Sequence, residues 1–148
     1  MAAKQYGFTD ARRKLTEVVD AAQRDVPPLI RRRKASEDDV IVISRRLLRS
    51  ALGVGESARF KVNSLREKDG STTLSMEPFG LAVNAPDKES AVAELTSDVQ
   101  AYAEDFLANR ELYLRSSNRA AHLPLVLEVL SCAGPAELCE ALGLAWVR

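Results

Sequence analysis

A Gly-Val-Gly segment at residues 53–55 divides the 148-residue chain into two parts. Glycine weakens helices and strands because its backbone is unusually free, so this segment predicts a linker. The net charge changes sign close to it. Residues 1–60 contain 13 Lys or Arg and 8 Asp or Glu, a net charge of +5, whereas residues 61–148 contain 8 and 13, a net charge of −5. We therefore predict two small domains, 1–53 and 54–148, with different partners.

The composition is typical of a folded protein and excludes several classes. Hydrophobic residues make up 46% of the chain and charged residues 28%, which allows a buried core. No apolar run approaches the roughly 20 residues of a membrane-spanning helix. The first residues, MAAKQYGFTD, lack the basic and apolar segments of a secretory signal. We expect a cytoplasmic protein with no membrane partner.

Few residues are candidates for catalysis or metal binding. Two cysteines, Cys132 and Cys139, and one histidine, His122, are too few for a disulfide scaffold or a Cys/His metal cage. His122 is the one strong candidate for a base near pH 7, and we interpret it as structural or surface-exposed. The two cysteines fit core positions better than a redox pair. Without a phosphate loop or metal-ligand spacing, we predict no enzyme, no cofactor and no metal.

The first half reads as a β-α-β-β-α arrangement. Residues 4–8 form a strand, and Thr9 or Asp10 caps the helix that follows. Pro27-Pro28 ends that helix before a strand that begins at Leu29 and runs into basic residues. An apolar, β-branched run at 40–43 predicts a buried strand, and Ser44 caps a second helix. The apolar face of the first helix consists of Ala11, Leu15, Val18, Val19 and Ala22.

The second half reads as a three-stranded meander followed by a long helix. Apolar residues alternate with polar ones around 58–62, 72–76 and 81–85, and turn signals such as Asp69-Gly70 separate these segments. Asp87 caps a helix whose apolar stripe faces the sheet. Two short helices end the chain, divided by Gly134-Pro135. The whole is an α+β protein. The predicted stripe is Val92, Leu95, Val99, Tyr102 and Phe106.

Basic residues are clustered in the first half. Arg12-Arg13-Lys14 lies in the first turns of the predicted helix, Arg31–Lys34 is a run of four cations, and Arg45, Arg46 and Arg49 begin the second helix. Cations oppose the dipole at a helix N-terminus unless solvent or a phosphate compensates. Nucleic-acid binding and a solvated charged surface both explain this pattern.

The first half resembles the N-terminal domain of Phd/YefM-type antitoxins over residues 5–52. That family has an aromatic first strand, a helix with the pattern S/T-x-AR-x-x-L-S/T-E-h-h (h is apolar), a strand with paired basic residues, and a VIVS-like strand before a helix. The corresponding segments here are YGFTDARRKLTEVVDAAQ, PLIRRR and DDVIVISRRLLRSAL. The resemblance implies a homodimer that binds its own operator DNA, with contacts from Thr9, Arg12, Arg13, Arg31, Arg32 and Arg33.

Two departures from the family pattern concern the second strand. The family has Gly before this strand, where this chain has Asp25-Val26-Pro27-Pro28. A short Arg-Gly turn is replaced by RKASEDD, whose acidic residues would weaken contacts of this hairpin with DNA. These departures favour the alternative that the chain is a protein-binding and dimerisation module without DNA binding.

The second half resembles HicB-like or RelB-like antitoxin domains in its β-β-β-α order. This resemblance implies a toxin-binding module, and a net charge of −5 suits a basic partner. A RelE-like or HicA-like ribonuclease fits this description, and a Doc-like kinase is a further possibility. The alternative is an acidic domain that serves only oligomerisation. The resulting prediction is a bacterial type II antitoxin and transcriptional autorepressor, with a small hydrolase as the enzymatic alternative.

Overall fold

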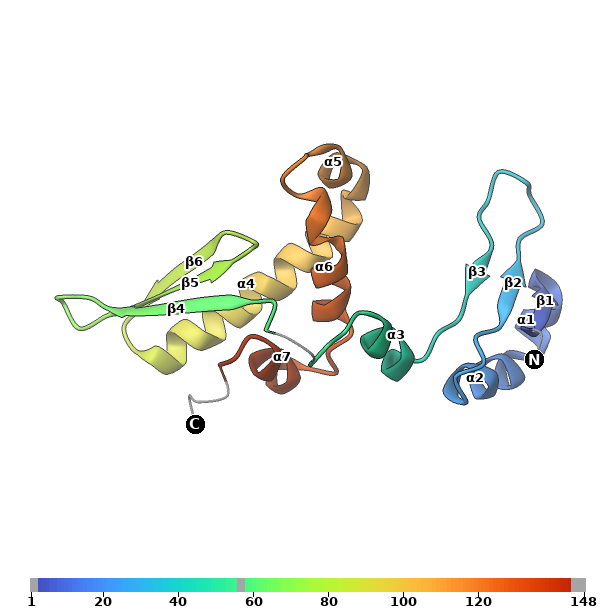
Figure 1. Cartoon of the computed structure of the whole chain (residues 1–148), viewed down its shortest axis with the longest axis horizontal. Coiled ribbons are helices and arrows are strands. Elements are labelled where there is room, and N and C mark those ends of the chain that lie inside the picture. The colour runs from blue at the N-terminus through green and yellow to red at the C-terminus, as the bar shows by residue number, and fades with distance from the viewer. Residues whose placement is uncertain (1–2, 56–57, 145–148) are drawn as a thin grey trace. The chain divides into compact units, whose positions relative to one another are not determined.

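The computed structural model describes residues 3–55 and 58–144 (Figure 1). The chain divides into two compact units, Met1–Ala51 and Leu52–Arg148. Each unit contains a three-stranded sheet together with helices, so the protein is α+β as predicted.

In the first unit the strands are β1 (Gln5–Gly7), β2 (Leu29–Arg31) and β3 (Val40–Ile41), in the order β1-β2-β3. β1 and β2 are parallel, whereas β2 and β3 are antiparallel. Two helices connect β1 to β2, as a parallel pair requires. These helices are α1 (Phe8–Arg13) and α2 (Leu15–Gln23), and α3 (Arg45–Ala51) follows β3. The small core of this unit includes Ala11, Val18, Ala21 and Ala22.

The first helix differs from the prediction at its start. It begins at Phe8 with Gly7 as N-cap, and no side chain caps it, so the predicted cap by Thr9 or Asp10 is wrong. The Thr9 hydroxyl accepts a hydrogen bond from Arg33, and the Asp10 carboxylate lies 2.6 Å from Arg13 Nη2, so both side chains are otherwise engaged.

The predicted single helix is also divided in two. At Lys14 the backbone leaves helical geometry (φ −111°, ψ 33°), which separates α1 from α2. Arg12 and Arg13 therefore lie in the last turn of a short helix rather than in the first turns of a long one. In that position the helix dipole favours positive charge instead of opposing it.

Apolar residues predicted to be buried in the first unit are exposed. Val40 and Ile41 are 47% and 62% exposed, and β3 contains only these two residues of the predicted strand at 40–43. β3 is an edge strand, paired on one side by β2, and both of its apolar side chains are exposed within the first unit. Leu15 and Val19, from the predicted core face of the helix, are 61% and 40% exposed.

The second unit is an antiparallel meander covered by helices. Its strands are β4 (Lys61–Arg66), β5 (Thr72–Glu77) and β6 (Leu81–Ala85), in that order. The long helix α4 (Lys88–Ala108) packs on β5 and β6, and α6 (Leu123–Leu130) and α7 (Pro135–Ala141) pack against α4 (Figure 1). β4 begins at Lys61, later than the predicted alternation.

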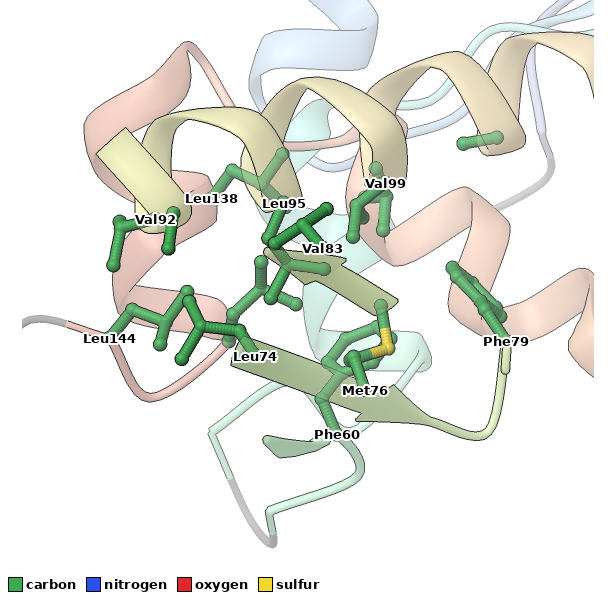
Figure 2. Packing of buried hydrophobic residues seen from close by; sticks show 14 of the residues in the cluster. Phe60, Leu74, Met76, Phe79, Val83, Val92, Leu95, Val99, Leu138 and Leu144 are labelled. Atoms are coloured by element: carbon green, nitrogen blue, oxygen red, sulfur yellow. The ribbon is translucent and has the colours of Figure 1, made fainter. Parts of the chain in front are cut away.

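The core of this unit confirms the predicted periodicity. Every second residue of β5 and β6 points into the core, where it meets the apolar stripe of α4 (Figure 2). Asp87 caps α4 as predicted and accepts a hydrogen bond from the backbone N–H of Ser90 at 2.7 Å. The buried residues on the two facing layers include Leu74, Met76, Val83, Val92, Leu95, Val99 and Phe106.

Two elements between α4 and α6 were not predicted, namely α5 (Arg110–Arg115) and the 3-10 turn η1 (Ala120–His122). Both segments are too short to show an apolar periodicity in the sequence. Aromatic side chains pack them against α4. The Tyr113 ring stacks on Phe106 with centroids 4.8 Å apart, and the Arg119 guanidinium lies 5.3 Å from the Tyr113 centroid.

A buried ion pair fastens the segment before β4 to α6. Arg59 Nη2 lies 2.8 Å from Glu128 Oε2, with side chains 23% and 6% exposed. The alternation around 58–62 predicts a strand with its polar residues on one side, and the structure places one of these polar residues, Arg59, against α6. A paired charge in such a position holds two elements in one geometry, because separating the partners would leave a buried charge unpaired.

Candidate nucleic-acid interface

Three of the predicted DNA contacts share one face of α1. Thr9, Arg12 and Arg13 are spaced i, i+3 and i+4, which places them on neighbouring positions of a helix surface. All three are exposed. Arg13 is held by Asp10, three residues earlier, while the Arg12 side chain makes no hydrogen bond within the described part of the chain. Arg12 is therefore available to an external anion.

The end of β2 lies beside this helix face. The Arg33 guanidinium donates a hydrogen bond to the Thr9 hydroxyl, which joins two residues 24 positions apart in the sequence. Arg31 ends β2 and pairs with Gly7, the last residue of β1. Because the two strands are parallel, their carboxyl ends lie at one edge of the sheet, the edge at which parallel sheets bind ligands. This region brings together Thr9, Arg12, Arg13, Arg31 and Arg33, which we call the cationic edge.

Arg32 differs from its neighbours because it contacts acidic residues of the same chain. Its Nε donates to Glu37 Oε2 at 3.0 Å, and its backbone N–H donates to Asp39 Oδ1 at 3.0 Å. Its guanidinium also lies 4.6 Å from the centroid of the Phe8 ring. Two acidic residues of the RKASEDD segment thus brace the loop between β2 and β3. Of the six predicted contact residues, Arg32 is the one that contacts acidic residues of this loop.

The arginines of α3 form a second basic group with a different role. Arg46 Nη2 lies 2.6 Å from Asp25 Oδ2, and the Ser44 hydroxyl donates to the other Asp25 oxygen at 2.8 Å. Ser44 also accepts from the backbone N–H of Leu47 at 3.0 Å, the predicted cap of α3. The hydrogen bond from Ser44, followed by that from Arg46, lowers the pKa of Asp25.

Asp25 explains the departure from the family pattern before β2. Its backbone has a φ of 56°, a left-handed conformation that glycine adopts freely and that Asp tolerates better than most residues. Nothing else in the sequence pattern marks Asp25 as important. The missing glycine at this point of the chain was the available signal.

The remaining reactive side chains lie in the second unit. His122 is 8% exposed and its Nδ1 is hydrogen-bonded to the Tyr102 hydroxyl at 2.7 Å. Cys132 and Cys139 are half-buried thiols that pack against the core, outside any disulfide. Within residues 3–55 and 58–144, no group of three His, Cys, Asp or Glu side chains is arranged to hold a metal ion. No helix in these ranges is long and apolar enough to cross a membrane.

The chain is thus a small α+β protein with one basic and one acidic half. A family profile, Phd-like, described as the antitoxin of RelE/RelB toxin-antitoxin systems, matches residues 1–143. The chain therefore belongs to this family of antitoxins. Membership in this family indicates a regulatory protein rather than an enzyme and implies a cognate toxin as partner.

A solved structure has the same fold. It is the antitoxin part of a proposed toxin/antitoxin system from Syntrophomonas wolfei subsp. wolfei, which is 22% identical to this chain. The alignment covers 93% of this chain and 95% of that one, with a TM-score of 0.65. Both units of the fold are thus found together in another protein. A comparison with curated proteins finds no match.

Proposed function

We propose that this antitoxin neutralises a toxin encoded beside it and represses its own operon. In this proposal residues 1–53 form a Phd/YefM-like domain that dimerises and binds operator DNA in the cytoplasm. Residues 54–148 form a HicB-like domain that binds the toxin. A RelE-like or HicA-like ribonuclease suits the acidic second half, because a protein that binds RNA carries basic surface.

The observation that carries DNA binding is the hydrogen bond between Arg33 and Thr9. It supports a single surface in which the end of β2 and the exposed face of α1 act together. Arg12 and Arg13 extend from that face, and Arg31 ends the adjacent strand. Guanidinium groups bind phosphates and can contact guanine with two parallel hydrogen bonds. Arg32 has a smaller role in the proposal, because Glu37 already binds it.

Exposed apolar residues support dimerisation of the first unit. Apolar side chains of α1, α2 and the β3 region are exposed in the single chain, and such exposed apolar surface is typical of interaction sites. A second copy would cover these side chains through a two-fold axis, and two cationic edges would then match the two halves of a palindromic operator. The exposed residues are Phe8, Leu15, Val19, Val40, Ile41 and Ile43.

Replacing Arg12 with Ala tests the DNA-binding surface. We expect Arg12→Ala to weaken binding to the DNA upstream of the gene by about 1–3 kcal/mol, roughly five- to a hundredfold in Kd, in a gel-shift titration. The matched control is Arg110→Ala, which removes an exposed arginine from the second unit. Equal affinities of the two variants, both folded by circular dichroism, would show that the cationic edge does not bind the operator.

The competing proposal is a protein-binding module that has lost DNA binding. The pairing of Arg32 with Glu37 and of Arg13 with Asp10 favours it, since two of the five arginines among the predicted contacts already have an acidic partner. In that case neither Arg12→Ala nor Arg110→Ala changes the weak, nonspecific DNA binding of the chain, while toxin binding is intact.

A further inference from the structure

A long groove crosses the second unit between α4 and α7. It has a volume of about 970 Å³ and is lined by one face of α4, the α6–α7 turn, α7 and Leu144. The α4 residues that line it extend from Glu89 to Glu104, sixteen residues of helix that rise about 22 Å from first to last. This length suits an extended or helical segment of a partner better than a compact small molecule.

The floor of the groove is apolar. Val92, Leu138 and Leu144 form part of it and are also part of the buried core (Figure 2). Thr96 is the polar residue of the floor, but its hydroxyl donates to the Val92 carbonyl at 2.7 Å and lies 3.4 Å from Cys139 Sγ. The floor therefore offers an apolar surface in which the polar group is already satisfied.

The rim of the groove carries charge of one sign. Glu89 and Glu104 lie at the two ends of the α4 face, and Glu140 lies on α7. All three are exposed, and the residues that line the groove include no Lys or Arg. Acidic side chains around an apolar floor complement a segment with an apolar side and basic residues at its edges.

We propose that this groove is the toxin-binding site and that it holds an amphipathic, Lys- or Arg-flanked segment of the toxin. The inference rests on the proposed function, since it names where and how the second unit contacts its toxin. It differs from toxin binding by a flexible tail, because here the antitoxin supplies the groove and the toxin supplies the inserted segment.

Substitutions that fill the groove test the proposal in the full-length chain. Ala101 and Ala136 line it and are exposed, so arginine there adds both bulk and charge of the same sign as the proposed segment. We expect Ala101→Arg and Ala136→Arg to weaken binding to the product of the neighbouring gene by about tenfold or more in calorimetry. Ala108→Arg, at an exposed alanine of α4 outside the groove, is the matched control and should bind as the unmodified chain does.

Charge reversals at the rim test the same binding site without filling the groove. Glu89→Lys with Glu140→Lys changes the rim without altering the floor, and Glu94→Lys with Asp98→Lys makes the same change on exposed positions of α4 outside the groove. We expect only the first pair to weaken toxin binding. The toxin should also slow alkylation of Cys132 and Cys139, because both thiols line the groove.

The outcomes separate the groove from the proposed function. If the unmodified chain fails to bind or neutralise the neighbouring gene product, the proposed function and this inference both fail. If it binds and the groove variants bind equally well, the function stands and the groove assignment is overturned. The assignment is also overturned if the groove variants change only the self-association of the chain, since the groove would then hold a second copy.

Discussion

At the scale of single residues, His122 is the side chain whose protonation is coupled most directly to folding. Its ring lies against Phe79, with centroids 5.2 Å apart, and its Nδ1 is hydrogen-bonded to Tyr102. Burial, followed by the nearby positive charge of Arg119, lowers the pKa of His122 below its usual 6.5, and Glu77 opposes this shift. Burial also raises the pKa of Tyr102, so both partners stay neutral near pH 7.

The lowered pKa predicts a loss of stability in mild acid. The unfolded chain binds the proton at His122 first, so the free energy of unfolding falls as pH drops below about 6.5, by at most about 1.4 kcal/mol per pH unit for one proton. Chemical denaturation between about pH 7.5 and 5.5 measures this slope. His122 is the only histidine in the sequence, so His122→Gln should flatten the profile while lowering stability throughout. A flat profile for the unmodified chain would contradict the prediction.

At the scale of elements, α3 is held to the first unit through Asp25. The side chain of Asp25 binds both Ser44 and Arg46, and Arg46 also donates to the Gln23 carbonyl at 3.4 Å. These bonds connect the turn after α2 to the first residues of α3. The positive charge of Arg46 at the start of α3 is thus compensated by Asp25 of the same chain rather than by a phosphate.

Substitutions of Asp25 separate this connection from backbone strain. Asp25→Gly keeps the left-handed backbone but removes the carboxylate, whereas Asp25→Ala removes the carboxylate and adds strain at a φ of 56°. We expect both variants to speed hydrogen exchange of the amides in α3. Asp25→Ala should in addition melt a few degrees below Asp25→Gly. Equal melting temperatures would show that the left-handed conformation is relaxed at little cost in the alanine variant.

The elements also show what the sequence could predict. β5, β6 and α4 follow from period-2 and helical patterns with clear boundaries, such as the Asp69-Gly70 turn and the Asp87 cap, because one chain buries the apolar face of each element. The prediction of a buried strand at 40–43 is wrong for the opposite reason. Val40 and Ile41 are exposed in the single chain, and sequence patterns do not distinguish a core from a surface that a second copy would cover.

The residues of the cationic edge could be predicted from the sequence, whereas the contacts among them could not. The basic residues are visible in the sequence, and the resemblance selected six contact residues among them. The pairing of Arg33 with Thr9, and of Arg32 with Glu37, depends on contacts between β2, α1 and the loop before β3. The break at Lys14 was missed because the residues around it continue a helical apolar pattern. The groove forms where α4 packs near α7, two helices about 30 residues apart in sequence. No sequence motif predicts this packing.

At the scale of the whole molecule, the zero net charge of the chain is the sum of two opposite halves. A single neutral surface would suit neither a nucleic acid nor a basic protein. Because the charges are separated into two units, the basic unit can bind DNA while the acidic unit binds a basic protein. Each unit then has one partner in the proposed function.

This division predicts different salt dependences for the two binding reactions. A dimer offers the exposed arginines Arg12, Arg13, Arg31 and Arg33 twice, or about eight phosphate contacts, so log K for operator DNA should fall with log salt with a slope near −7. Toxin binding should depend less steeply on salt, because in the proposed complex the toxin segment buries apolar surface on the floor of the groove. Fluorescence anisotropy with operator DNA, and calorimetry with the toxin, between about 50 and 300 mM salt measure both slopes. A shallow slope for DNA would favour the protein-binding module, and a toxin slope as steep as that for DNA would assign toxin binding to charge rather than to the groove.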